Sequence, residues 1–109
     1  MKLVLVCYSG SSASILRDRM LAWARANLLD VEIIVSSLAG LDGDKEDADI
    51  VLVGPQVRCA LASVRERVPE RIPVMAVDTR DYGMAKGDRV MQAALDEIRQ
   101  YKEHKIHME

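Results

Sequence analysis

A cysteine followed by small polar residues stands near the start of the chain. Cys7 ends a short apolar run, and the next five residues read Tyr-Ser-Gly-Ser-Ser before a helical pattern begins. Unpaired amides and a partial charge of roughly +0.5 at a helix amino end favour a thiolate and lower the pKa of such a cysteine. The same amides, with serine hydroxyls beside them, suit the oxygens of a phosphate group. The pattern therefore predicts phosphoryl transfer through a phosphocysteine at Cys7.

Other interpretations of the cysteine stay open. A cysteine that ends a strand also occurs as a small core residue beside an ordinary turn, in which Ser11 or Ser12 would accept from the first helical amides. A cysteine phosphatase needs an arginine after the five-residue loop, but Ala13 stands there and the next arginine is Arg17. A carrier is favoured for that reason. The alternatives are a low-molecular-weight phosphatase or arsenate-reductase-like enzyme, and an anion-binding regulatory module without turnover.

The elements that position Cys7 follow from the apolar pattern. Four short runs rich in β-branched residues predict buried strands, at 2–6, 31–35, 50–53 and 74–77. Helical spacing of apolar residues predicts helices over 13–28, 57–68 and 91–101, and the acidic stretch 36–49 predicts an irregular crossover with a turn of helix. Strands that alternate with helices indicate an α/β fold, a small doubly wound, four-stranded parallel sheet with helices on both faces. The phosphate-binding loop after the first strand would then share the carboxyl edge of the sheet with loops 54–56 and 78–83.

Length and charge limit the class of protein. The chain has 109 residues, a formal net charge of -2 and 50% hydrophobic residues, which predicts a single domain over residues 1–109. The balanced charge, with only three tyrosines and one tryptophan, disfavours a nucleic-acid partner. No apolar run approaches the roughly 20 residues that cross a bilayer. With two cysteines and no leader pattern, we expect a cytoplasmic protein with reduced thiols.

Three motifs resemble one family of sugar-transport proteins. The segment 7–14, Cys-Tyr-Ser-Gly-Ser-Ser-Ala-Ser, resembles the active loop of the enzyme IIB component of the sugar phosphotransferase system, in its lactose, cellobiose and chitobiose class. The segment 53–56, Val-Gly-Pro-Gln, resembles the family's Leu-Gly-Pro-Gln after the third strand. The segment 77–83, with Val-Asp at its start and Tyr-Gly at its end, is similar to the family's loop after the fourth strand. The motifs agree in order and spacing over nearly the whole chain.

The resemblance implies a phosphoryl relay. Cys7 would accept the group from a phosphohistidine of a IIA component and donate it to a sugar, such as cellobiose, chitobiose or lactose, bound by the membrane IIC component. The amide cradle, with three serine hydroxyls as further donors, would be formed by Tyr8, Ser9, Gly10, Ser11, Ser12 and Ala13. The resemblance implies no metal and no cofactor, and a cytoplasmic chain associated with the membrane through IIC.

Several other residues have both a functional and a structural interpretation. Gln56 and Tyr82 follow the third and fourth strands, so we expect them near the cysteine loop, where they would orient the phosphate or a partner's histidine. Turn formation by Gly-Pro and Tyr-Gly explains them as well. Cys59 is predicted to be an inert thiol rather than a redox partner of Cys7. The two histidines, 104 and 107, offer too few ligands for a metal site.

Charged side chains give two further hypotheses. Asp78 or Asp81 would be the general acid in the phosphatase alternative, and Asp81 followed by Tyr82 is similar to the acid loop of low-molecular-weight tyrosine phosphatases. Four arginines, which oppose the acidic stretch 42–49, form solvated faces or steer an acidic partner by long-range attraction. These arginines are Arg58, Arg65, Arg67 and Arg71.

Overall fold

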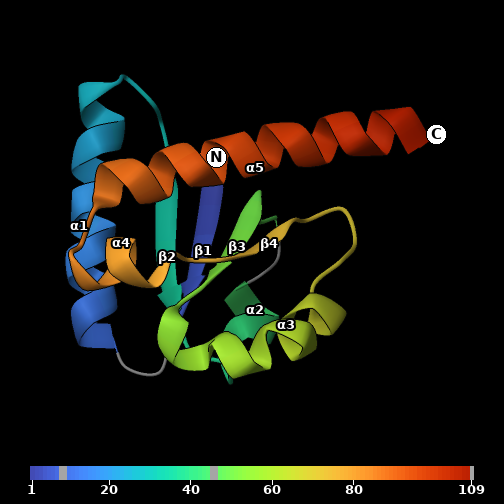
Figure 1. Ribbon diagram of the computed structural model, residues 1–109, viewed down its shortest axis with the longest axis horizontal. Coiled ribbons are helices and arrows are strands. Elements are labelled where there is room, and N and C mark those ends of the chain that lie inside the picture. Colours follow the sequence, from blue (N-terminus) through green and yellow to red (C-terminus); the bar gives the residue numbers. More distant parts are fainter. Residues whose placement is uncertain (8–9, 45–46, 109) are drawn as a thin grey trace.

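Four parallel strands form a sheet at the centre of the molecule (Figure 1). The structure, a computed structural model, describes residues 1–7, 10–44 and 47–108. Within these residues the strands are β1 (Lys2–Val6), β2 (Glu32–Ser36), β3 (Ile50–Val53) and β4 (Val74–Ala76), and their order across the sheet is β2-β1-β3-β4. Every pairing in it is parallel. The predicted α/β fold with a four-stranded parallel sheet is confirmed.

The two central strands are buried on both of their faces. Every residue of β3, and every residue of β1 after the first, is 0% exposed. Side chains alternate between the faces of a sheet, so Leu3 and Leu5 join one hydrophobic core while Val4 and Val6 join the other. A strand that feeds two cores must be apolar at every position, which explains the unbroken apolar run before Cys7.

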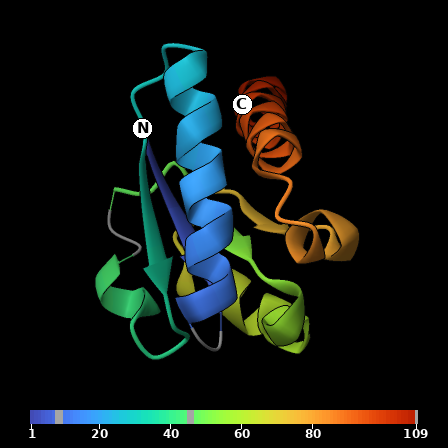
Figure 2. The ribbon, with the colours of Figure 1, turned by 90° about the vertical axis from the view of Figure 1, so that its left-hand side faces the viewer.

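Helices cover both faces of the sheet (Figure 2). The long helices α1 (Gly10–Ala26) and α5 (Gly87–Met108) lie side by side over one face, where Leu16, Met20 and Met91 are buried. The other core includes Val57 and Val64, and three short elements contribute to it. They are α2 (Leu41–Asp44), the 3₁₀ helix η1 (Pro55–Ala60) and α3 (Leu61–Arg67).

The first helix differs from the sequence prediction at both ends. It begins at Gly10, three residues earlier than predicted, so Ser11 and Ser12 lie within its first turn. The expectation that one of these serines precedes the helix as its cap is therefore wrong. The helix ends at Ala26 because Leu28 adopts a left-handed φ of 58° and the Leu29 N–H donates to the Ala24 carbonyl at 2.8 Å.

Three other helical segments also differ from the prediction, one of them α5, which extends over Gly87–Met108 where 91–101 was predicted. The helix predicted over 57–68 is divided into η1 and α3, because Val57 has non-helical dihedral angles (φ -115°, ψ 19°). The segment after β4, expected to be a loop, contains the short helix α4 (Thr79–Gly83). Asp78 caps α4, since its Oδ1 accepts from the amides of Arg80 at 2.9 Å and Asp81 at 3.0 Å. The single helical turn expected within 36–49 is α2.

The corner between α4 and α5 is built differently from the predicted bend at Tyr82 and Gly83. Gly83 is the last residue of α4 and its φ is not positive; the left-handed residue is Ala85, with φ 51°. Beyond the corner, Gly87 lies directly against α1. A Cβ built on Gly87 would be 2.5 Å from the backbone carbonyl carbon of Arg19. The absence of a side chain at Gly87 therefore allows α5 to approach α1 closely.

Candidate functional site

Cys7 directly follows the central strand β1 at its carboxyl end. Its N–H donates to the Ser36 carbonyl at 2.9 Å, which fixes the backbone of Cys7 to the end of β2. The residue is 4% exposed and lies in the core that also contains Ala13, Val77 and Tyr82. The sheet thus holds the thiol in place at the edge where ligands bind in α/β folds of this kind.

The amino end of α1 begins shortly after Cys7. Gly10 is the first helical residue, and Ala13, in the first turn, is fully buried. Unpaired amides at the start of a helix are suited to an anion. Of the predicted cradle, Tyr8 and Ser9 lie outside the described residues, and the structure places the backbone of 10–13 in the helix.

Gln56 and Tyr82 are brought together beside Cys7, as the strand order required. Burial raises the pKa of the Tyr82 phenol, the charge of Cys7 raises it further, and a side-chain hydrogen bond with Gln56 lowers it. Tyr82 is 7% exposed, whereas Gln56 lies at the surface. The structure thus places Tyr82 beside Cys7, and Gln56 beside Tyr82.

Gly54 makes this arrangement possible. Its N–H donates to the Val6 carbonyl at 2.9 Å, which brings the exit of β3 against the end of β1. A Cβ on Gly54 would be 3.2 Å from both Gln56 Oε1 and the Val6 carbonyl oxygen, and 3.4 Å from Tyr82 Cε2. From the sequence alone, this glycine is expected only to form a turn. Its second role, as the contact point between three segments of the site, appears only when the strands are paired.

The surroundings of the thiol correct one electrostatic expectation. Burial raises the pKa of Cys7, whereas the sequence pattern predicts a lowered pKa. The cause is desolvation, because the side chains that share its core are apolar or aromatic. The described part of the site therefore favours the protonated thiol in the protein alone.

The two aspartates considered as general acids have structural roles. Asp78 caps α4 through two backbone amides. Asp81 accepts from Arg89 Nε at 3.0 Å, and its side chain is 18% exposed. Both carboxyl groups are engaged in these contacts. The structure therefore adds no support for the phosphatase alternative.

The arginines and the second cysteine have separate environments. Arg67 pairs with Asp42 at 3.2 Å and donates to the Leu38 carbonyl at 2.8 Å, which joins α3 to the segment around α2. Arg58 Nη2 donates to Thr79 Oγ1 at 3.1 Å. Cys59 is exposed and forms no disulfide with Cys7.

No group of three or more potential metal ligands occurs among the residues whose side chains the structure describes, and the side chains of 104 and 107 are not among these. Within the described residues, no helix is both long enough and apolar enough to span a bilayer.

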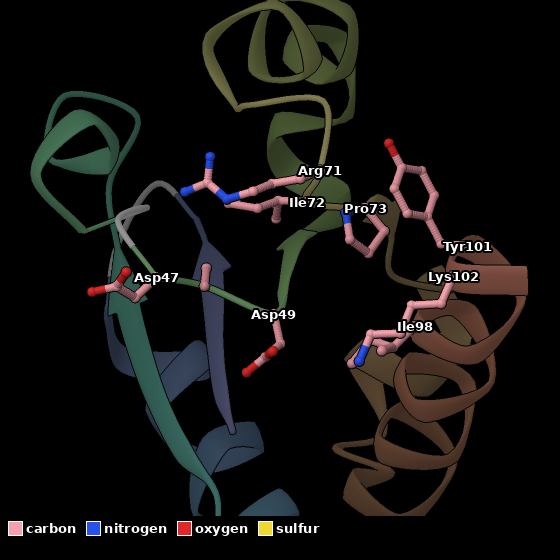
Figure 3. Close-up of a pocket in the computed structure, with 9 residues that line it drawn as sticks. Asp47, Asp49, Arg71, Ile72, Pro73, Ile98, Tyr101 and Lys102 are labelled. Carbon is pink, nitrogen blue, oxygen red and sulfur yellow. The ribbon is translucent and has the colours of Figure 1, made fainter. Parts of the chain in front are cut away.

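A hollow of about 270 Å³ lies at the opposite edge of the sheet (Figure 3). Residues that precede β3 and β4 form one wall, and α5 forms the other. Its lining includes Asp47, Asp49, Arg71, Tyr101 and Lys102. Because it adjoins the amino ends of the strands, it is separate from the site around Cys7.

Similarity to known proteins identifies the family of this chain. The family model for the PTS system, Lactose/Cellobiose specific IIB subunit, matches residues 2–93. The chain belongs to this family. As a IIB component it is a phosphotransferase component of a sugar phosphotransferase system, in which IIB components work with IIA and IIC partners.

Characterised relatives of this IIB chain carry several sugar specificities. It is 33% identical over 98 residues to the galactose-specific EIIB component of Lactococcus lactis subsp. cremoris (strain MG1363), covering 84% of this chain and 91% of that protein. The match to the cellobiose-specific EIIB component of Lactococcus lactis subsp. lactis (strain IL1403) has the same identity and coverage. The oligo-beta-mannoside-specific EIIB component of Bacillus subtilis (strain 168) is 35% identical over 98 residues, covering 86% of this chain and 92% of that protein.

Solved structures share the fold of the IIB chain. The cellobiose-specific IIB component of Borrelia burgdorferi matches with a TM-score of 0.77 and 28% identity, over 93% of this chain and 94% of that chain. The lactose-specific IIB domain of Streptococcus pneumoniae matches with a TM-score of 0.74 over 89% of this chain and 96% of that chain. At 17% identity the second match supports the fold alone.

Proposed function

We propose that Cys7 is the phosphoryl acceptor of this IIB chain. It takes the group from a phosphohistidine of a IIA component and donates it to a sugar bound by the membrane IIC component. The observation that carries the proposal is the position of Cys7, held between the end of β1 and the start of α1 with Gln56 and Tyr82 beside it. We also propose that residues 1–109 act as one domain in this relay.

The transfer consists of two displacements at phosphorus. In the first, Cys7 Sγ attacks, the S–P bond forms and the N–P bond to the donor histidine breaks; the thiol proton passes to the released imidazole. In the second, a sugar hydroxyl oxygen attacks, the O–P bond forms and the S–P bond breaks; the hydroxyl proton leaves to restore the thiol. Neither step requires an oxidant, a metal or a nucleotide.

The amides of Tyr8 through Ala13 are proposed to hold the phosphoryl oxygens, with the hydroxyls of Ser9, Ser11 and Ser12 as further donors. The helical start at Gly10 supports this role, because the first amides of α1 have no partner within the helix. The same amides favour the thiolate over the thiol, and so would oppose the burial that raises the pKa of Cys7.

Gln56 and Tyr82 are proposed as accessory residues that orient the phosphoryl group or the donor histidine. The position of Tyr82 beside Cys7, and of Gln56 and Tyr82 on either side of Gly54, supports this role. The presence of Ala13 where a phosphatase has an arginine supports a carrier over a hydrolase, since no guanidinium at that position stabilises attack by water.

The proposed substrate is a disaccharide of the cellobiose, chitobiose or lactose type, bound by IIC rather than by this chain. The cellobiose-specific relatives support this class. We propose that the chain works in the cytoplasm and meets the membrane through IIC.

The experiment that tests the acceptor is intact-protein mass spectrometry after incubation with a phosphoenolpyruvate-driven relay that ends in a lactose-class IIA. The unsubstituted chain and Cys59→Ala should each gain one phosphoryl group, and Cys7→Ala should gain none. Cys59→Ala is the matched control, because it removes the exposed thiol and retains the buried one. A phosphoryl group retained by Cys7→Ala would move the acceptor elsewhere, and hydrolysis of aryl phosphates without IIA would favour a phosphatase.

A further inference from the structure

A hydrogen bond links the two short helices, η1 and α4, that carry Gln56 and Tyr82. Arg58 Nη2 donates to Thr79 Oγ1 at 3.1 Å. Arg58 lies in η1, two residues after Gln56, and Thr79 is the first residue of α4, three residues before Tyr82. The bond therefore connects η1, which carries the Gln56 amide, to α4, which carries the Tyr82 phenol.

The two elements leave the sheet from neighbouring strands. Their inner sides meet at Gly54, where a Cβ would touch both Gln56 and the Tyr82 ring. The Arg58–Thr79 bond joins them at the surface, where both side chains are exposed. Gln56 and Tyr82, the accessory pair, are thus held from two sides, by packing at Gly54 and by a hydrogen bond at the surface.

The backbone of η1 needs such support more than a regular helix does. Val57, between Gln56 and Arg58, departs from helical dihedral angles, and the Gly54 residue that precedes η1 supplies no side-chain cap. Because 3₁₀ hydrogen bonds have poorer geometry than those of an α-helix, the direction of a side chain on η1 depends on tertiary contacts.

We propose that Arg58 is a positioning residue, which acts through Thr79 to keep Gln56 and Tyr82 in place beside Cys7. This inference rests on the proposed function, in which Cys7 accepts the phosphoryl group. Arg58 itself is not assigned a contact with the phosphoryl group. Its effect on the reaction passes through the accessory pair.

The first measurement uses the unphosphorylated chain and needs no partner protein. Arg58→Ala and Thr79→Val should both shift the NMR signals of the Gln56 side-chain amide and the Tyr82 ring. Thr79→Ser keeps the hydroxyl and should leave these signals in place. Arg65→Ala, which removes an exposed arginine from α3, is the matched control and should also leave them unchanged. Unchanged signals in Arg58→Ala would overturn the proposal, and this result would stand whether or not Cys7 is the acceptor.

The second measurement is the rate of phosphoryl transfer from phosphorylated IIA. Arg58→Ala should lower kcat about fivefold, the size expected from loss of one hydrogen bond, with little change in KM. Arg58→Ala combined with Thr79→Val should be no slower than either variant alone, because both remove the same interaction. In a background that lacks both accessory side chains, Gln56→Ala with Tyr82→Phe, Arg58→Ala should produce no further loss.

The same kinetics distinguish a docking role. If Arg58 contacts the partner directly, Arg58→Ala will raise KM with kcat unchanged, and the effect will weaken as salt increases. That result, or multiplicative effects of Arg58→Ala and Thr79→Val, would overturn the proposal. If no variant accepts a phosphoryl group while the NMR shifts occur as expected, the proposed function fails, but the link between η1 and α4 is still supported.

Discussion

The contact between Gly87 and α1 gives a direct test of how the two long helices are packed. A Cβ on Gly87 would lie 2.5 Å from the carbonyl carbon of Arg19 and from the backbone nitrogen of Met20, and 2.8 Å from Arg19 Cβ. Backbone atoms within a helix cannot rotate aside as a side chain tip can. In Gly87→Ala, α5 must therefore move away from α1, by about 1 Å if ordinary contact near 3.5–4 Å is to be restored.

The cost of this movement is larger than what alanine gains in a helix. Overpacking in a well-packed core typically costs about 1–3 kcal/mol. Alanine offsets this by no more than about 1 kcal/mol, because it has a higher helix propensity than glycine. We expect a net loss of about 1 kcal/mol in the free energy of unfolding, with a fall in Tm of about 5 °C for a domain of this size.

Gly83→Ala is the matched control. Like Gly87, Gly83 is a terminal residue of a helix, and its φ is not positive. Nothing lies within 4 Å of a Cβ built on Gly83. This variant should be unchanged in stability or gain up to about 1 kcal/mol. Both variants are measured by urea unfolding followed by circular dichroism. If Gly87→Ala loses no more stability than Gly83→Ala, the close approach of α5 to α1 is wrong.

Two further predictions concern the thiol and the end of α1. Because burial disfavours the thiolate and so raises the pKa of Cys7, the rate of alkylation of Cys7 in Cys59→Ala should rise with pH and should not level off at the ordinary thiol value of about 8.5. Mass spectrometry measures this rate, and rapid alkylation at pH 7 would contradict the assigned environment. Leu28→Gly should raise the free energy of unfolding by about 1 kcal/mol, since Leu28 has a φ of 58° while its side chain is 94% exposed. Leu28→Ala, which keeps the Cβ, is the control; equal stability of the two variants would show that the left-handed conformation costs nothing.

The sequence predicted the parts of the fold that depend on burial. An apolar residue at every position of β1 and β3 can only be accommodated by strands covered on both faces, and both strands lie at the centre of the sheet. The proximity of Cys7, Gln56 and Tyr82 followed from the rule that carboxyl ends of parallel strands share one edge. Both predictions depend on the strand pattern alone and not on the resemblance to a sugar-transport family.

The features that the sequence did not predict depend on contacts between segments. The start of α1 at Gly10 is not encoded in apolar spacing, because its first turn contains only small residues. The direction of the pKa shift at Cys7 depends on the apolar side chains around it, which come from other elements. The bond between Arg58 and Thr79 joins residues 21 positions apart, and helical spacing placed Arg58 on a solvated face.

The depth of Cys7 has a consequence for the order of events during sugar uptake. Because Cys7 is only 4% exposed, it offers too little surface for two proteins to reach its sulfur at the same time. Under the proposed relay, IIA must dissociate before IIC can reach the same sulfur, so the two partners compete for the chain. Turnover would then follow ping-pong kinetics, and excess unphosphorylated IIA would slow transport by occupying the loaded carrier.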